Sequence, residues 1–135
     1  MNTAIEIAEY ILSKTPMSNL RLQKILYFIQ GESYKRYGCP AFTDRISAWK
    51  HGPVVPNVYN KFCAYGGSEI SLKTDVNLED STKVITDAIV NKYKDSYVWD
   101  LVDETHKKDT PWDKIYHKYG DKSPIPESYI REYFM

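Results

Sequence analysis

The sequence predicts a mainly α protein, a single compact helical domain (residues 1–135) with a small inserted β-ribbon. Apolar residues recur at helical spacing through most of the chain. Residues that favour helix starts and ends, chiefly Ser, Thr, Pro and Gly, separate these stretches. One alternating stretch around a Gly-Pro turn interrupts the helical pattern in the middle of the chain. A chain of 135 residues with no repeat or linker can fold around one core without disulfides or a structural metal.

The N-terminal part is expected to form two helices. Thr3 and the glutamate three positions later have the spacing of a capping box, and Pro16 ends the first helix. Ser18 is a suitable N-cap for a longer second helix that closes at Gly38. Gly31 lies inside this helix at a cost of about 1 kcal/mol relative to Ala, which predicts close packing of another element there. The residues expected to face the core are Ala4, Ile5, Ala8, Ile11 and Leu12 in the first helix, and Leu22, Ile25, Leu26 and Ile29 in the second.

The middle of the chain predicts the β-ribbon. Residues 42–49 alternate imperfectly between apolar and polar side chains and lead into a turn at 51–53. Ile70 and Leu72 also alternate with polar neighbours, so they could pair as a second short strand.

The remaining apolar stretches predict helices with marked boundaries. Pro56 opens one that two glycines stop, and Thr110 caps another with Pro111 at its first position. Ile125 and Ile130 are placed as a hydrophobic staple around Pro126, which opens the last helix. The expected helical stretches are Pro56 to Tyr65, a stretch through Val84, Ile85, Ala88 and Ile89, a stretch from Val98 to Thr105 after a break near Asp95 and Ser96, a short helix that starts at Pro111 and ends just before Gly120, and the helix after Pro126.

Composition and charge exclude several classes of function. Eighteen Lys and Arg balance eighteen Asp and Glu, and no basic stretch stands out, so nucleic acid is not an expected partner. No apolar stretch approaches the ~20 residues needed to cross a membrane, and the N-terminus lacks the features of a signal peptide. We therefore expect a soluble, cytoplasmic protein. Cys39 and Cys63 lie far apart and are expected to be reduced thiols rather than metal ligands or a redox pair.

No catalytic or metal-binding arrangement is predicted. The sequence lacks the motifs of phosphate-binding loops, dinucleotide sites, serine hydrolases and zinc peptidases. His106 with Asp109 or His117 would need a third ligand that the spacing does not offer. His51 could act as a base with Asp44 orienting it, and this pair is the one enzymatic alternative. We expect no cofactor and no catalytic residue.

Three parts of the sequence together point to a family. They are LRLQKILYFIQG (20–31), AWKHGPVVPNVYNKFCAYG (48–66), and THKKDTPW (105–112) followed by IPESYIREYF (125–134). In order and spacing they resemble the Panacea antitoxin-domain family, also described as SocA-like or phage-associated GepA-like proteins. The resemblance covers essentially the whole chain. The middle segment is the most specific, because a Trp, a basic residue, a Gly-Pro turn, a second Pro and a Tyr rarely coincide at this spacing.

The resemblance implies a mostly helical fold and the function of an antitoxin, which neutralises a cognate toxin protein by direct binding. An adaptor that delivers its bound partner to a protease is a related alternative, and an enzyme centred on Asp44 and His51 is the alternative from another class. The resemblance leaves the identity of the toxin and the oligomeric state open.

The middle segment is the expected partner-binding site. Its prolines and glycine reduce the conformational entropy that the turn loses when a partner binds. Trp and Tyr are common hot-spot residues at interfaces. The twelve tyrosines of the chain also suit surfaces that are wet when free and buried when bound. The expected partner-binding residues are Trp49, Lys50, His51, Gly52, Pro53, Val54 and Tyr59. The alternative is that Trp49, Pro53 and Tyr59 only lock the ribbon onto the second helix, where Gly31 would admit them.

Overall fold

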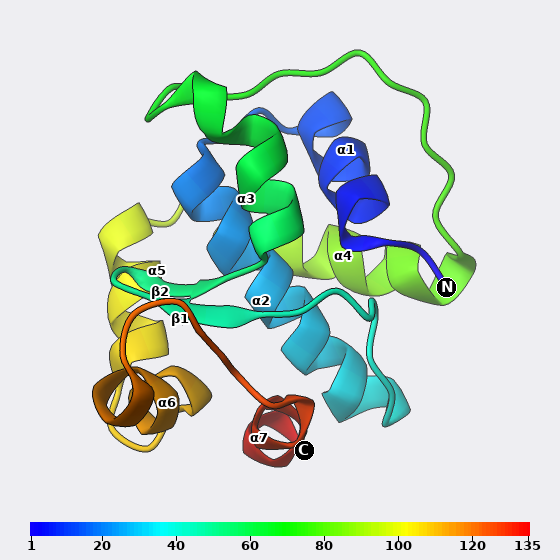
Figure 1. Cartoon of the computed structure of the whole chain (residues 1–135). Helices are drawn as coiled ribbons and strands as arrows, with labels where there is room; N and C mark the ends of the chain where they lie inside the picture. The colour runs from blue at the N-terminus through cyan, green and yellow to red at the C-terminus, as the bar shows by residue number, and fades with distance from the viewer.

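Helix α2 (Asn19–Tyr37) runs through the middle of the molecule, and most other elements pack against it (Figure 1). The computed structural model describes all residues, 1–135. The most extensive contacts of α2 are with α4 (Asp80–Tyr93) and α7 (Glu127–Phe134). The other helices are α1 (Ala4–Lys14), α3 (Pro56–Phe62), the short 3-10 helix η1 (Cys63–Tyr65), α5 (Val98–His106) and α6 (Pro111–Tyr119). The predicted mainly α class is confirmed. None of the helices combines the length and hydropathy that spanning a membrane requires.

The capping residues that the sequence suggested do cap the first two helices. The Thr3 hydroxyl accepts a hydrogen bond from the Glu6 N–H at 3.1 Å, and the Glu6 carboxylate accepts one from the Thr3 N–H at 2.8 Å. The Ser18 hydroxyl accepts from the Arg21 N–H at 3.3 Å. Gly38 ends α2 with a φ of 72°, a left-handed conformation that glycine adopts without strain.

The apolar stripe of α2 lies at the centre of the core. Leu22, Leu26 and Ile29 have no exposed surface, as their spacing predicted. They belong to a single cluster of 31 buried apolar residues contributed by nearly every element. Ile5, which was also expected to face the core, is partly buried and packs against this cluster. Val84 lies in the predicted helix α4 but is 54% exposed.

The predicted ribbon forms a small sheet. Strands β1 (Ser47–Trp49) and β2 (Gly52–Val54) pair antiparallel, with Trp49 opposite Gly52. A third strand, β3 (Ser123–Pro124), pairs with the other edge of β1 and gives the order β2-β1-β3. The expected strand from residue 42 is shorter than predicted, because the backbone of Phe42 bonds to the side chain of Gln30 instead of to a strand.

Ile70 and Leu72 do not form a strand of this sheet, so that prediction is wrong. Ile70 makes an isolated antiparallel bridge with Met17, and the Leu72 N–H donates to the carbonyl oxygen of Leu12 at 3.1 Å. These backbone groups are free to pair because Pro16 prevents α1 from continuing. Segment 66–79, which joins η1 to α4, therefore passes around α1 on the outside of the molecule (Figure 1).

The close approach predicted at Gly31 is made by the C-terminal helix. A Cβ added to Gly31 would lie 2.6 Å from the ring of Phe134 on α7. The suggestion that Gly31 admits the ribbon residues is wrong. The ribbon crosses α2 about two turns earlier, where its backbone meets Gln23 and Lys24.

Candidate functional site

Polar side chains on α2 hold the ribbon and the segment after it. The Gln23 side-chain oxygen accepts a hydrogen bond from the Val55 N–H at 2.8 Å. Its amide nitrogen donates to the side-chain oxygen of Asn19 at 2.9 Å, and the Asn19 amide donates to the carbonyl oxygen of Tyr59 at 3.3 Å. Both side chains are almost fully buried. Since buried amides are costly to leave unpaired, this network fixes the position of the ribbon on α2.

Lys24 is the most unusual member of this group. Its side chain has no exposed surface, and its amine donates to the carbonyl oxygen of Pro53 at 2.8 Å. No carboxylate forms an ion pair with it. Burial lowers the pKa of Lys24 to about 7. Sequence reasoning missed both Gln23 and Lys24, although two polar residues set among the apolar residues of 20–31 were a visible signal.

Gly52 is the point where the three sequence segments meet. Its φ is 113°, and a Cβ at this position would lie 2.6 Å from the Thr105 hydroxyl oxygen and 3.0 Å from Cε of Lys24. Only glycine fits both the backbone conformation and the space. The middle segment is thus wedged between α2 on one side and the end of α5 on the other.

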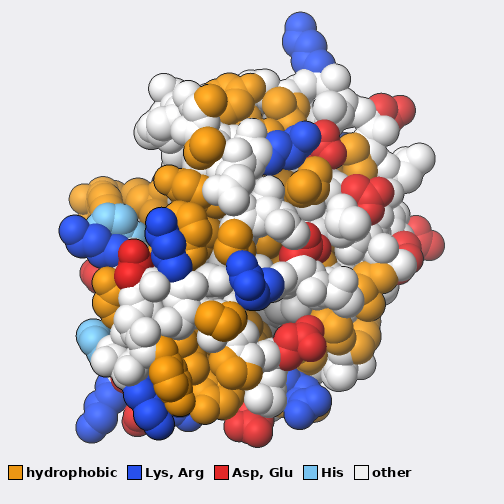
Figure 2. All heavy atoms as spheres, viewed as in Figure 1, with side chains coloured by type: hydrophobic (Ala, Val, Ile, Leu, Met, Phe, Trp, Pro, Cys, Tyr) orange, Lys and Arg blue, Asp and Glu red, His pale blue; other side chains and the backbone are white.

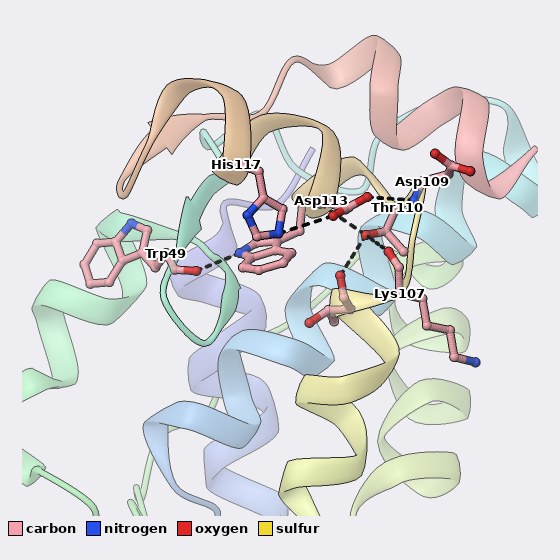
Figure 3. Close-up of polar contacts among 8 residues, drawn as sticks. Trp49, Lys107, Asp109, Thr110, Asp113 and His117 are labelled. Carbon is pink, nitrogen blue, oxygen red and sulfur yellow. Dashed lines mark hydrogen bonds and ion pairs between the residues drawn. The ribbon is translucent and has the colours of Figure 1, made fainter.

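The third segment holds the ribbon from the other side. The indole N–H of Trp112 donates to the carbonyl oxygen of Trp49 at 2.7 Å (Figure 3). The Trp112 ring stacks on that of His106, with centroids 3.8 Å apart and an interplanar angle of 2°. Thr110, which caps α6, donates to the carbonyl oxygen of Thr105 at 2.9 Å and so fixes the turn between α5 and α6. Burial lowers the pKa of His106, which favours a neutral ring in this stack.

The outer side of the ribbon carries aromatic and basic side chains. Trp49 and Tyr59 meet edge to face with ring centroids 4.7 Å apart, and the Lys122 amine lies 5.0 Å from the Trp49 ring centroid. The His51 ring meets that of Trp99 on α5 at 5.3 Å. Hydrophobic, histidine and basic side chains lie together at the tip of the ribbon in Figure 2.

The seven residues predicted to bind a partner do not share one exposed face. Lys50 and His51 are exposed, and Trp49 and Tyr59 are half-buried. The remaining three, Gly52, Pro53 and Val54, are buried and form the inner part of the ribbon. Sequence reasoning missed Trp99, which is 41% exposed, because an aromatic residue on the polar face of a short helix gives no periodic signal.

The alternative catalytic pair is not formed. The two carboxylate oxygens of Asp44 accept hydrogen bonds from the Ala4 N–H and the Asn57 side-chain amide, both at 3.0 Å. His51 packs against Trp99 instead, and no hydrogen bond or ion pair joins it to Asp44. The histidine, cysteine and acidic side chains also form no group of three that could hold a metal ion.

Comparison with known proteins gives two similarities. Residues 22–113, which include the whole ribbon and its supports on α2, α5 and α6, match the model of the family described as "Antitoxin SocA-like, Panacea domain". The chain is 40% identical over 78 residues to Antitoxin SocA of Caulobacter vibrioides (strain NA1000 / CB15N). That alignment covers 52% of this chain and 42% of the relative, so it spans less than half the length of the relative. No solved structure is similar.

Proposed function

This chain belongs to the Panacea-domain family of SocA-like antitoxins, and we propose that it is itself an antitoxin, which neutralises a cognate toxin protein by binding it directly. The observation that carries the proposal is the ribbon. It is fixed from behind by α2 and by Trp112, and it presents aromatic and basic side chains on its outer side. The proposed role is binding, with no chemical step.

The rigid support of the ribbon favours tight binding. Association is weakened by the loss of entropy of any group that becomes ordered on binding. Here Gln23, Lys24 and Trp112 already fix the backbone of 49–55 in the free protein. A toxin that docks on this surface would therefore order only a few exposed side chains.

The proposed contact surface consists of Trp49, Lys50, His51, Tyr59 and Trp99. Trp and Tyr are the residue types most often found as interface hot spots, and Trp49 and Tyr59 have one side packed and the other accessible. The inner residues Gly52, Pro53 and Val54 serve this surface indirectly, by setting the shape of the ribbon.

Isolation of the protein from its native host with mass spectrometry would test the proposal. We expect one stoichiometric protein partner whose expression alone stops growth and whose effect this chain reverses. Two results together would favour the adaptor alternative: protease subunits co-purify with the chain, and the bound partner is degraded only when that protease is present. The absence of any stoichiometric protein partner would contradict the proposal.

Surface variants then locate the interface. We expect the double variant His51→Ala/Trp99→Ala to weaken toxin binding by about thirtyfold or more, with little change in melting temperature, because both side chains are exposed. Tyr37→Ala is the matched control, since Tyr37 is an equally exposed aromatic residue (44%) at the far end of α2. Equal neutralisation by the double variant and the control would place the interface elsewhere.

A further inference from the structure

A cavity of about 230 Å³ lies next to the proposed contact surface, between the start of α2, the ribbon and α3. Leu20, Trp49, Val54 and Tyr59 give it an apolar wall. The remaining lining residues are Asn19, Gln23, Lys24, His51 and Gly66. No aspartate or glutamate lines the cavity. Its volume is several times the ~30 Å³ that one water occupies, so an amino-acid side chain can enter it.

Three residues that line the cavity have N–H groups with no acceptor in the protein. The Lys24 amine makes a single hydrogen bond, to the carbonyl oxygen of Pro53, and this leaves further N–H bonds unpaired. The indole N–H of Trp49 is buried and has no partner. His51, the third lining residue with an N–H, forms no hydrogen bond with the protein and no ion pair. An apolar cavity with spare donors and no acid is complementary to a group that carries acceptors and negative charge.

We propose that this cavity receives an acidic side chain, Asp or Glu, of the toxin, and that its carboxylate pairs with the amine of Lys24. The inference rests on the proposed antitoxin function, because it names the anchor by which the toxin would be held. Lys24 has no exposed surface in the free protein, so the carboxylate reaches its amine only when side chains of the cavity wall move aside, and the pair then forms in surroundings with little water. Charge-assisted hydrogen bonds in such surroundings are stronger than those at an exposed lysine.

Burial of the Lys24 amine also has a cost for folding, which its bond to the Pro53 carbonyl oxygen must offset. A buried amine without a carboxylate partner destabilises the folded state, and its lowered pKa reflects that penalty. A methionine of similar length would fill the same space. A destabilising polar group at the edge of a contact surface is typical of residues retained for binding.

The first experiment probes the cavity directly. N-acetylglutamate methylamide and its glutamine analogue have the same shape and differ in charge. We expect the glutamate probe to shift the NMR signal of the Trp49 indole N–H saturably, and the glutamine probe to bind about tenfold more weakly or not at all. Equal binding of the two probes, or no saturable shift with either, would overturn the proposal.

Two variants assign the effect to the cavity. Lys24→Met removes the amine, and Leu20→Trp fills the cavity from its half-buried wall without touching Lys24. We expect both to lose the preference for the glutamate probe. Leu20→Trp keeps the test decisive should Lys24→Met fail to fold. Retention of the full preference in a folded Leu20→Trp variant would contradict the proposal.

The same variants separate this inference from the proposed function. With the captured toxin, we expect Lys24→Met to lower affinity at least about tenfold, and one Asp→Asn or Glu→Gln change in the toxin to have no further effect in that variant. Full affinity of Lys24→Met would refute the acidic anchor while leaving the antitoxin function intact. If no toxin is found but the glutamate probe still binds, the antitoxin function fails, and the cavity is a site for a free carboxylate compound instead.

Discussion

The indole N–H of Trp112 lies 2.7 Å from the carbonyl oxygen of Trp49, although 63 positions separate the two residues in the chain. This bond ties β1 to α6, while Gln23 and Lys24 tie β2 and the segment after it to α2. The ribbon is therefore held between α6 on one side and α2 on the other. Changes in these buried contacts should alter both the stability of the fold and the shape of the contact surface.

Trp112→Phe should lower the free energy of unfolding by about 1–3 kcal/mol. The substitution keeps an aromatic ring against His106 but leaves the Trp49 carbonyl without its donor. Urea denaturation of the purified protein measures the effect. Trp99→Phe is the control, because that exposed indole makes no hydrogen bond within the protein, and it should change the stability little. Equal effects of the two substitutions would show that the bond to Trp49 contributes nothing.

Gly52→Ala should destabilise the protein far more than Gly38→Ala. Both glycines have positive φ, 113° and 72°, but only at Gly52 would the added Cβ collide with the Thr105 hydroxyl. Left-handed backbone alone costs a non-glycine residue roughly 1–2 kcal/mol, which is our expectation for Gly38→Ala. The clash should add about 1–3 kcal/mol at Gly52. Melting temperatures of the two variants that lie within a degree or two of each other would contradict this account.

Lys24 should make the stability of the parent protein depend on pH. Its pKa falls from 10.5 to about 7 on folding, so between these values the unfolded chain holds a proton that the folded chain lacks. The contribution of Lys24 to the free energy of unfolding therefore rises with pH between about 7 and 10.5, by about 1.4 kcal/mol per pH unit. Below about pH 7 this contribution is constant. Lys24→Met should remove this slope and be more stable than the parent at pH 7.

Urea denaturation at several pH values between 6 and 9 tests the role of Lys24. The difference between the parent and Lys24→Met isolates this group, because other titrating residues contribute equally to both. Lys83→Met, which alters an exposed lysine on α4, should leave the slope unchanged. Parallel pH profiles for the parent and Lys24→Met would mean that the amine stays charged in the folded protein.

Leu26→Ala should lower the free energy of unfolding by about 2–5 kcal/mol, because it removes buried apolar surface and leaves a cavity in the central helix. Val84→Ala is the matched control. Val84 is 54% exposed, so its truncation should change stability by no more than about 0.5 kcal/mol. Thermal or urea unfolding measures both variants. If Leu26→Ala were as stable as the parent protein, the assignment of Leu26 to the core would be wrong.

Features set by neighbouring residues were predictable from the sequence. The capping box at Thr3 and the N-cap at Ser18 depend on side chains within a few positions of the structure they form. The turn of the ribbon was predicted at 51–53 but lies at Lys50 and His51, because Gly52 and Pro53 already pair with β1. Strand β3 was not predictable, because two residues are too few to show a period of two. The bridge between Met17 and Ile70 joins backbone groups of distant segments and has no side-chain signature.

The site was predictable only in part for the same physical reason. The segment 49–59 stood out by composition, but which of its residues face outward depends on the register of β1 and β2 against α2. Lys24 looks like an ordinary polar helix residue until Pro53 is placed against it. Nothing in the sequence near Trp99 indicates that it meets His51.

Segment 66–79 has a practical consequence. Its tip at 73–75 is exposed, whereas the chain before it contributes α1, α2, α3 and the ribbon pair, and the chain after it contributes α4 to α7. Helix α2 packs against α4, α5 and α7 across this division, so each half carries apolar surface that only the other half covers. A nick between Lys73 and Thr74 should therefore yield two fragments that reassociate without a covalent link. The two fragments would then form a complementation pair, in which the folded protein assembles only when both fragments are present.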